Sequence, residues 1–170
     1  MNYVDFLEKL DSKLEAYRTL HKKFLHCQKG CSSCCEKGDY PLSQIELKYL
    51  MQGYISLEND TKIKIQSNIK NFKKGGKCPF LINSECSVYS YRPIICRVHG
   101  LAYLCGENKV KTPYCVKKDK NYSEVYKDGK ITINPIVENL DTPNLLRNFD
   151  YGGIRNLYDW INQSPNNEVL

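Results

Sequence analysis

Apolar and polar positions recur with a helical period in three parts of the chain. Over residues 3–25 the apolar and aromatic side chains fall every three or four positions, which predicts one amphipathic helix. Ser43 and Glu46 have the Ser-x-x-Glu spacing of a helix capping box, so a second helix is predicted over residues 43–52. A third helix is predicted over residues 60–72, where it runs into a Lys-Lys-Gly-Gly turn.

The rest of the chain has weaker periodicity and more turn residues. Residues 77–115 alternate cysteines with prolines and short apolar runs, which indicates a segment organised by bound ligands. Residues 122–133 predict two short strands around an Asp-Gly turn. Residues 144–163 predict a final helical stretch, bent at Gly152 and the glycine after it. The predicted fold class is therefore mainly α with a small β-hairpin, in one compact, cysteine-rich domain over residues 1–170.

Nine cysteines are the outlying feature of the composition. The N-terminal sequence lacks the basic and apolar regions of a signal peptide, so we expect a cytoplasmic protein. No run of about 18 apolar residues could span a bilayer, and we expect no membrane partner. In a reducing compartment, clustered cysteines hold metal or carry out redox chemistry more often than they form disulfides. An odd number of thiols also cannot all pair within one chain, which leaves a secreted disulfide protein as the disfavoured alternative.

The formal net charge of +6 raises the question of nucleic acid. Eight thiolates holding two zinc ions would, however, lower that charge to about +2. Lysines are spread over residues 62–77 and 109–130 without an arginine-rich block, a pattern more typical of a solvated surface than of a binding patch. Nucleic acid is therefore not the expected partner.

The first group of cysteines has the spacing Cys27-x3-Cys31-x2-Cys34-Cys35. On a helix this spacing would place Cys27, Cys31 and one of the last two along one face, and in a loop around Gly30 the thiols could converge on one ion. Adjacent side chains on a helix point about 100° apart, so Cys34 and Cys35 are awkward partners for one mononuclear ion. They would more easily serve two sites, or one of them could bridge two metals.

The second group is more widely spaced and comes from one compact segment. Cys78, Cys86 and Cys96 offer three more thiols. Pro79 and Pro93 stiffen the turns of this segment. Arg92 and Arg97 could offset thiolate charge or donate hydrogen bonds to sulfur.

Four further residues could extend the ligand set. Cys105 or Cys115 could supply an eighth position, and His26 or His99 could replace a thiolate. His21 lies on the apolar stripe of the first helix, which favours an ordinary packed residue over a ligand.

The first cysteine group and four later motifs carry a family resemblance. After the first cysteine group come Pro-Leu-Ser-x-x-Glu at 41–46, Cys-Pro-Phe-Leu at 78–81, Cys-Ser-Val-Tyr at 86–89 and Tyr-Arg-Pro-x-x-Cys-Arg at 91–97. Together they resemble the YkgJ-type cysteine-cluster family, also described as the CxxCxxCC zinc- or iron-chelating domain. The match spans about residues 27–100, with one extra residue between the first two cysteines. The resemblance implies a cytosolic metal-binding module, and with Cys105 added the predicted metal ligands are Cys27, Cys31, Cys34, Cys35, Cys78, Cys86, Cys96 and Cys105.

The function that we predict is a metal-binding protein that holds an iron–sulfur cluster, with [4Fe–4S] favoured, or Zn²⁺. Thiolate ligands suit both, and the role would be structural or redox, in the service of an unidentified protein partner or protein substrate. A metal- or cluster-dependent protein-modifying enzyme, methylase-like, is one alternative, because longer proteins that resemble the family are linked to lysine methylation. A zinc-stabilised nucleic-acid or protein adaptor is another. No catalytic residue is assigned, because known catalytic motifs are missing from the sequence. Cys27, Cys31 and Cys34 have the three-cysteine spacing of radical S-adenosylmethionine enzymes. In those enzymes the spacing follows the first strand of an α/β barrel, whereas here it follows a long predicted helix.

Overall fold

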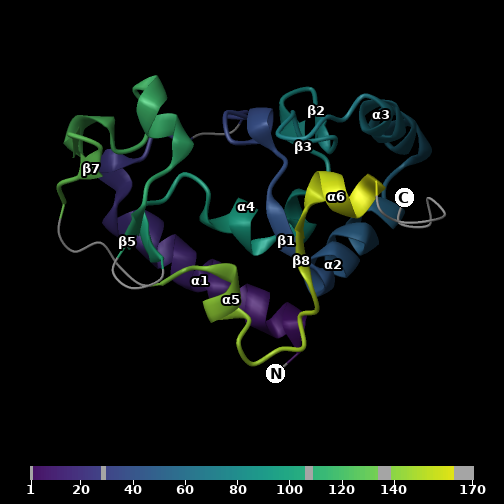
Figure 1. Cartoon of the computed structure of the whole chain (residues 1–170), viewed down its shortest axis with the longest axis horizontal. Coiled ribbons are helices and arrows are strands. Elements are labelled where there is room, and N and C mark those ends of the chain that lie inside the picture. The colour runs from purple at the N-terminus through teal and green to yellow at the C-terminus, as the bar shows by residue number, and fades with distance from the viewer. Residues whose placement is uncertain (1, 28–29, 106–108, 134–138, 163–170) are drawn as a thin grey trace. The chain divides into compact units, whose positions relative to one another are not determined.

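The computed structural model describes residues 2–27, 30–105, 109–133 and 139–162. The chain divides into two compact units, which are described separately (Figure 1). Unit 1 contains residues 1–28 and 97–149, and unit 2 contains residues 29–96 and 150–170. That the chain acts as a single domain stays a prediction from the sequence.

Unit 1 begins with the long helix that the apolar stripe predicts. Helix α1 (Tyr3–Leu20) has a capping box between Asn2 and Asp5, and buries Leu7, Leu10, Leu14 and Tyr17. The other elements are η1 (Lys22–Phe24), β4 (Tyr103–Cys105), β5 (Lys109–Lys111), η4 (Tyr114–Lys118), η5 (Ser123–Val125), β6 (Tyr126–Lys127), β7 (Lys130–Ile131) and α5 (Thr142–Leu145). Strands β4 and β5 pair antiparallel, as do β6 and β7, which form the predicted hairpin.

A small core in unit 1 surrounds Tyr122. Its buried members are Ala102, Val116, Tyr122 and Ile131. The hydroxyl of Tyr17 donates to the Ala102 carbonyl at 3.0 Å, and Nδ1 of the buried His21 lies 2.8 Å from the Tyr122 hydroxyl. His21 is thus a packed residue of the helical stripe, as the sequence predicts.

Unit 2 contains the other predicted helices and most of the cysteines. Its elements are η2 (Cys35–Lys37), β1 (Pro41–Ser43), α2 (Gln44–Ile55), α3 (Asn59–Lys70), β2 (Leu81–Ile82), β3 (Glu85–Cys86), η3 (Tyr89–Tyr91), α4 (Ile94–Val98), β8 (Ile154–Asn156) and α6 (Leu157–Asn162). Helix α4 crosses from unit 2 into unit 1 at Arg97. The apolar core of unit 2 is made of Leu42, Leu47, Leu50, Tyr54, Ile65, Phe80, Val88 and Leu157.

The prediction for the C-terminal region is wrong in its middle part. Instead of one helical stretch over 144–163, α5 ends at Leu145 and β8 pairs antiparallel with β1 (Figure 1). Gly152 has a φ of +67°, a left-handed conformation that a continuous α-helix does not contain, and the chain pairs with β1 from Ile154 onward. Gln163, the last residue of the predicted stretch, lies outside the described residues.

The fold class is confirmed at the level of mainly helical structure with small antiparallel sheets. Four two-stranded sheets, rather than one hairpin, occur within the residues that the structure describes. No helix in this part of the chain is long and apolar enough to cross a membrane.

Candidate metal centre

Unit 2 contains six of the nine cysteines. Cys31 and Cys34 precede η2, Cys35 begins it, Cys86 lies in β3 and Cys96 in α4. The sixth, Cys78, comes just before β2. Cys27, Cys105 and Cys115 belong to unit 1.

Electrostatic interactions link the thiols of unit 2. The pKa of Cys35 is raised well above its usual range, first by a hydrogen bond with Cys34, then by burial and by repulsion from Cys34, Cys78 and Cys96. Burial, followed by repulsion from Cys78, Cys86, Cys34 and Glu46, strongly raises the pKa of Cys96. These five residues, Cys34, Cys35, Cys78, Cys86 and Cys96, form what we call the five-thiol cluster.

Two members of the cluster carry features that favour the thiolate. Burial raises the pKa of Cys78 to about 12, but the backbone amide of Phe80 donates to its sulfur and opposes the rise. Burial also raises the pKa of Cys86, against the opposing effects of a hydrogen bond from the Val88 amide and of the charge of Arg92. In both cases the donor lies two residues after the cysteine, so the same local turn presents each sulfur to a backbone amide.

A tight hairpin holds these two turns together. Strand β2 pairs with β3 so that Leu81 lies opposite Cys86. Asn83 and Ser84 connect the strands, and both have a positive φ, as a two-residue type I′ turn requires. The Ser87 amide then donates to the Phe80 carbonyl at 3.0 Å.

The segment around η2 is held against Cys78 by a close backbone approach. The Cys78 amide donates to the Cys35 carbonyl at 2.8 Å. Gly38 lies so near that a Cβ at that residue would be 2.3 Å from the Cβ of Cys78. The hydroxyl of Tyr40 donates to the Cys34 carbonyl at 2.6 Å, which ties the backbone of Cys34 to the residue just before β1.

Glu46 positions the helix that carries Cys96. Its buried carboxylate accepts the amide and hydroxyl of Ser43 at 2.7 and 2.6 Å, which confirms the predicted capping box. Its other oxygen accepts the Ile94 amide at 2.9 Å, at the start of α4. One carboxylate thus connects the start of α2 with the start of α4.

The two arginines of the motif have different roles. Arg92 packs over the Tyr89 ring at 3.9 Å, and its charge opposes the rise that burial causes in the pKa of Cys86, as expected of an arginine that offsets thiolate charge. Arg97 is buried in unit 1, where its guanidinium pairs with Asp11 of α1 and its carbonyl accepts from Arg18. The structure therefore assigns Arg97 to the packing of α1.

The thiol of Cys27 has a separate environment in unit 1. Asn121 is 1% exposed and donates its amide to the Cys27 sulfur at 3.0 Å and to the Gly100 carbonyl at 2.8 Å. Its oxygen accepts the His26 amide at 2.7 Å. Gly100 has a φ of +83°, and a Cβ there would lie 2.9 Å from the Cys27 sulfur. Asn121 therefore donates a hydrogen bond to this sulfur, and the missing side chain of Gly100 leaves room for it.

The remaining candidates are also placed in unit 1. Cys115 lies in η4, and its charge, like that of Cys27, raises the pKa of Tyr122, although burial is the larger cause. Cys105 ends β4. Burial and the charge of Lys111 lower the pKa of His99 to about 4, so its imidazole is neutral at pH 7.

Of the eight predicted ligands, five lie near enough to one another in unit 2 to influence one another's pKa values. Cys31 lies in the same unit, whereas Cys27 and Cys105 lie in the other. Among the described residues, no three or more His, Cys, Asp or Glu side chains form an arrangement that could hold a metal ion as they stand. The full ligand set stays a prediction.

A family model matches residues 26–127, which include all nine cysteines, and its description is "putative zinc- or iron-chelating domain". The chain belongs to this CxxCxxCC family. The description supports metal binding and confirms the resemblance seen in the cysteine motifs. No curated protein and no solved structure matches the chain.

Proposed function

We propose that this CxxCxxCC protein binds metal through the five-thiol cluster, with Cys31 as a further ligand, and holds a [4Fe–4S] cluster or zinc. The observation that carries the proposal is that a backbone hydrogen bond joins Cys78 to Cys35 and that Cys34, Cys86 and Cys96 interact electrostatically with these two residues in unit 2. Thiolate sulfur is the donor that both zinc and iron–sulfur clusters prefer.

The chemistry of the donor set fits a thiophilic cation. Without one, burial and mutual repulsion raise the pKa values of Cys35, Cys78, Cys86 and Cys96. A bound cation would offset that repulsion, because it supplies the positive charge that the thiolates need. The amides that donate to sulfur at Cys78 and Cys86 would orient these two ligands.

The metal itself would supply either structural cross-linking of the cysteine segments or one-electron redox chemistry. The backbone bond from Cys78 to Cys35 would keep two of those segments in register during either role.

The test measures iron, zinc and acid-labile sulfide per chain, on protein purified without oxygen. Roughly four iron and four sulfide indicate a cubane cluster, and one or two zinc without sulfide indicate a zinc site. Cys34→Ser and Cys78→Ser should lose most of the metal. Cys115→Ser is the matched control outside the cluster and should keep it. Equal metal content in the cluster variants and the control, or no iron and zinc in any of them, would refute the proposal.

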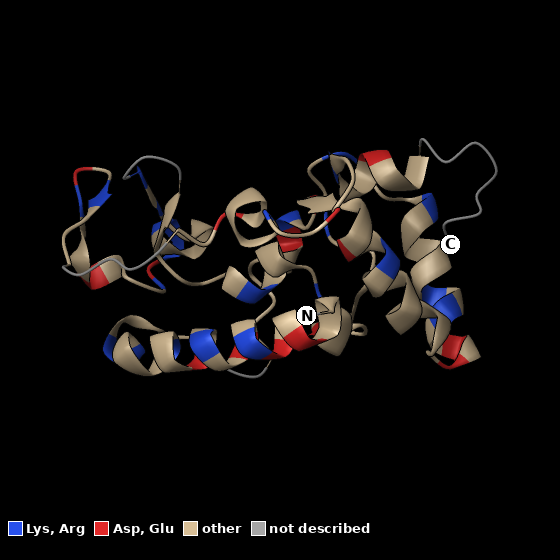
Figure 2. Cartoon of the chain, turned by 90° about the horizontal axis from the view of Figure 1, so that it is seen from below, with Lys and Arg blue, Asp and Glu red and all other residues tan. Residues whose placement is uncertain are grey.

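We further propose that the centre serves a protein partner or protein substrate rather than nucleic acid. Lys and Arg positions are interleaved with Asp and Glu along α1, so this helix does not present the one-signed surface that a phosphate backbone favours (Figure 2). Fluorescence anisotropy with a labelled DNA duplex and a single-stranded RNA should show no saturable binding at physiological salt. Submicromolar binding that weakens with added salt would contradict this part of the proposal.

A further inference from the structure

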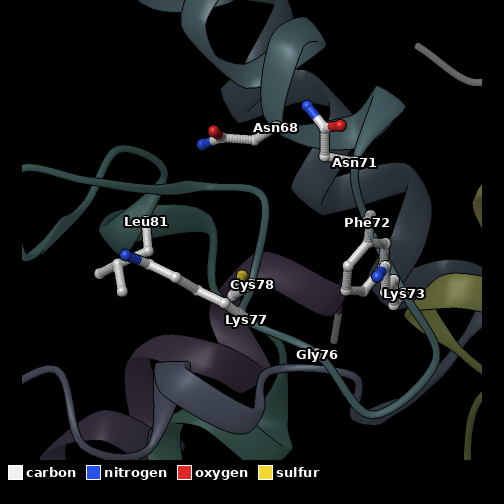
Figure 3. Close-up of a pocket in the computed structure, with 8 residues that line it drawn as sticks. All are labelled: Asn68, Asn71, Phe72, Lys73, Gly76, Lys77, Cys78 and Leu81. Atoms are coloured by element: carbon white, nitrogen blue, oxygen red, sulfur yellow. The ribbon is translucent and has the colours of Figure 1, made fainter.

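A cavity of about 300 Å³ opens in unit 2 between the end of α3 and the start of β2 (Figure 3). Its volume is at the small end of the range for ligand pockets. Asn68 and Asn71 line it from α3 and the residue after it, and Cys78 lines it from the other side. Lys73 and Lys77 contribute the charged part of the lining.

The lining carries positive charge without a carboxylate. Neither the Lys73 ammonium nor the Lys77 ammonium makes a hydrogen bond or an ion pair within the part of the chain that the structure describes, and no Asp or Glu lines the cavity. Asn68 donates one amide hydrogen to the Pro79 carbonyl at 3.0 Å, and Asn71 donates one to the Ser67 carbonyl at 3.0 Å. Each side-chain amide keeps a second hydrogen for a ligand.

The backbone holds the two lysines on one turn. The Gly76 amide donates to the Lys73 carbonyl at 2.8 Å, which closes the turn between them. The Gly75 amide donates to the Asp39 carboxylate at 2.8 Å, which ties the turn to the segment that follows η2. The carboxylate that touches this turn is thus engaged by a backbone amide and does not line the cavity.

We propose that this cavity binds a small organic anion, a carboxylate or phosphate with a short apolar body, beside the metal centre. The Lys77 ammonium lies beside Leu81 and the Lys73 ammonium beside Phe72, at opposite ends of the lining (Figure 3). Either one, together with an asparagine amide, suits the anionic group, because lysine is a common ligand of phosphate and carboxylate. The ring of Phe72 and the side chain of Leu81 suit the apolar body. Cys78 belongs to both the cavity and the five-thiol cluster, so the position beside a metal rests on the proposed function, whereas anion binding does not.

The experiment is titration calorimetry of the full-length protein, as purified without oxygen, with phenyl phosphate as the probe. Inorganic phosphate and benzyl alcohol separate the contributions of charge and of the apolar body. Lys73→Gln/Lys77→Gln should bind phenyl phosphate about tenfold more weakly, because both ammonium groups that line the cavity are lost. Lys70→Gln/Lys74→Gln is the matched control, because it removes the same charge from neighbouring positions that do not line the cavity, and it should bind as the wild type does.

Two results would overturn the proposal. Equal weakening in both double variants would mean that net charge alone attracts the anion, and no saturable binding by the wild type would mean that the lysines only offset thiolate charge. Metal content measured on the same samples separates the two proposals. Protein that contains metal but does not bind the anion would refute the anion site and not the metal centre. Protein that binds the anion but contains no metal would refute the metal centre and not the anion site. With both present, phenyl phosphate should shift the thiolate-to-metal absorption of cobalt- or iron-loaded protein, and a spectrum unchanged at saturation would refute the position beside the metal.

Discussion

Replacing Gly38 with alanine tests how closely two cysteine-bearing segments must approach. A Cβ at this residue would lie 2.3 Å from the Cβ of Cys78, and 2.8 Å from its backbone nitrogen and Cα. Ordinary contacts of a Cβ are 3.4–4 Å, so the segments would have to separate by about 1 Å. The φ of Gly38 is −84°, which other residues readily adopt, so the effect would come from crowding alone.

The expected magnitude follows from that separation. A shift of about 1 Å would stretch the bond from the Cys78 amide to the Cys35 carbonyl, now 2.8 Å, beyond hydrogen-bonding distance. Losing the bond costs about 1 kcal/mol and the crowding about 1–3 kcal/mol, so the free energy of unfolding should fall by about 2–4 kcal/mol. Metal–sulfur distances tolerate only about 0.2 Å, so metal affinity should fall at least about tenfold.

The assay compares metal per chain and urea unfolding of Gly38→Ala with those of the wild type. Gly153→Ala is the matched control in the same unit, because a Cβ there meets nothing within 4 Å and its φ is not left-handed. The control should match the wild type in both measurements. Wild-type metal affinity and stability in Gly38→Ala would refute the reasoning that this close approach assembles the centre.

Four other perturbations have expected outcomes. Glu46→Gln should lower the free energy of unfolding by about 2 kcal/mol in urea titrations, because an amide cannot accept at both ends from Ser43 and Ile94; a change below about 0.5 kcal/mol would contradict the role of Glu46. Asn121→Ala should lower the free energy of unfolding by about 2–4 kcal/mol in the same assay, because a buried side chain with three hydrogen bonds is lost. Unchanged stability would contradict this role of Asn121. Chelating the metal should leave the chain partly unfolded, since structural zinc contributes about 10–16 kcal/mol; an unchanged circular dichroism spectrum and Tm would contradict this. The pKa of His99 is lowered to about 4, so wild-type stability should decline relative to His99→Gln as pH falls from about 6.5 to 4, by up to about 3 kcal/mol, and parallel pH profiles would refute it.

Helix boundaries could be predicted where the deciding contacts lie within one turn. Ser43 and Glu46 are three residues apart, so their spacing alone predicts the start of α2. The second contact of Glu46, to Ile94, joins residues 48 positions apart, and no local spacing encodes it. The sequence therefore predicted the cap but not its link to the helix of Cys96.

The C-terminal region shows the opposite case. Its apolar residues have helical spacing, yet their contacts are decided by partners far along the chain. Leu157 packs in the core of unit 2, and the Trp160 indole donates to the Leu42 carbonyl at 2.9 Å. Because β1 pairs with the residues just before Leu157, Ile154–Asn156 form strand β8 instead of a helix. Such non-local pairing leaves no periodic signal in a three-residue strand.

At the site, the motif predicted a set of cysteine ligands but not the residues that hold those cysteines in place. The cysteines of the five-thiol cluster could be named from their spacing and family resemblance. The supports are single residues, such as Gly38 against Cys78, Tyr40 on the Cys34 carbonyl, and Asn121 on the Cys27 sulfur. A lone glycine, tyrosine or asparagine has many uses in proteins, so only the structure could identify these.

The position of the cluster explains why metal and folding should be coupled. Cys78 and Cys86 pack against the apolar core of unit 2, and the hairpin between them has strands of two residues, too short to be stable alone. Without a cation, burial and the repulsion that a neighbouring ionised sulfur would exert keep these thiols protonated, so the thiols do not link the segments. A bound cation would stabilise the thiolates and would link the segments. Cys78 also lines the cavity that contains Lys73 and Lys77. An anion bound in the cavity would therefore lie beside one of the proposed metal ligands, and its negative charge should alter the thiolate-to-metal absorption of the centre.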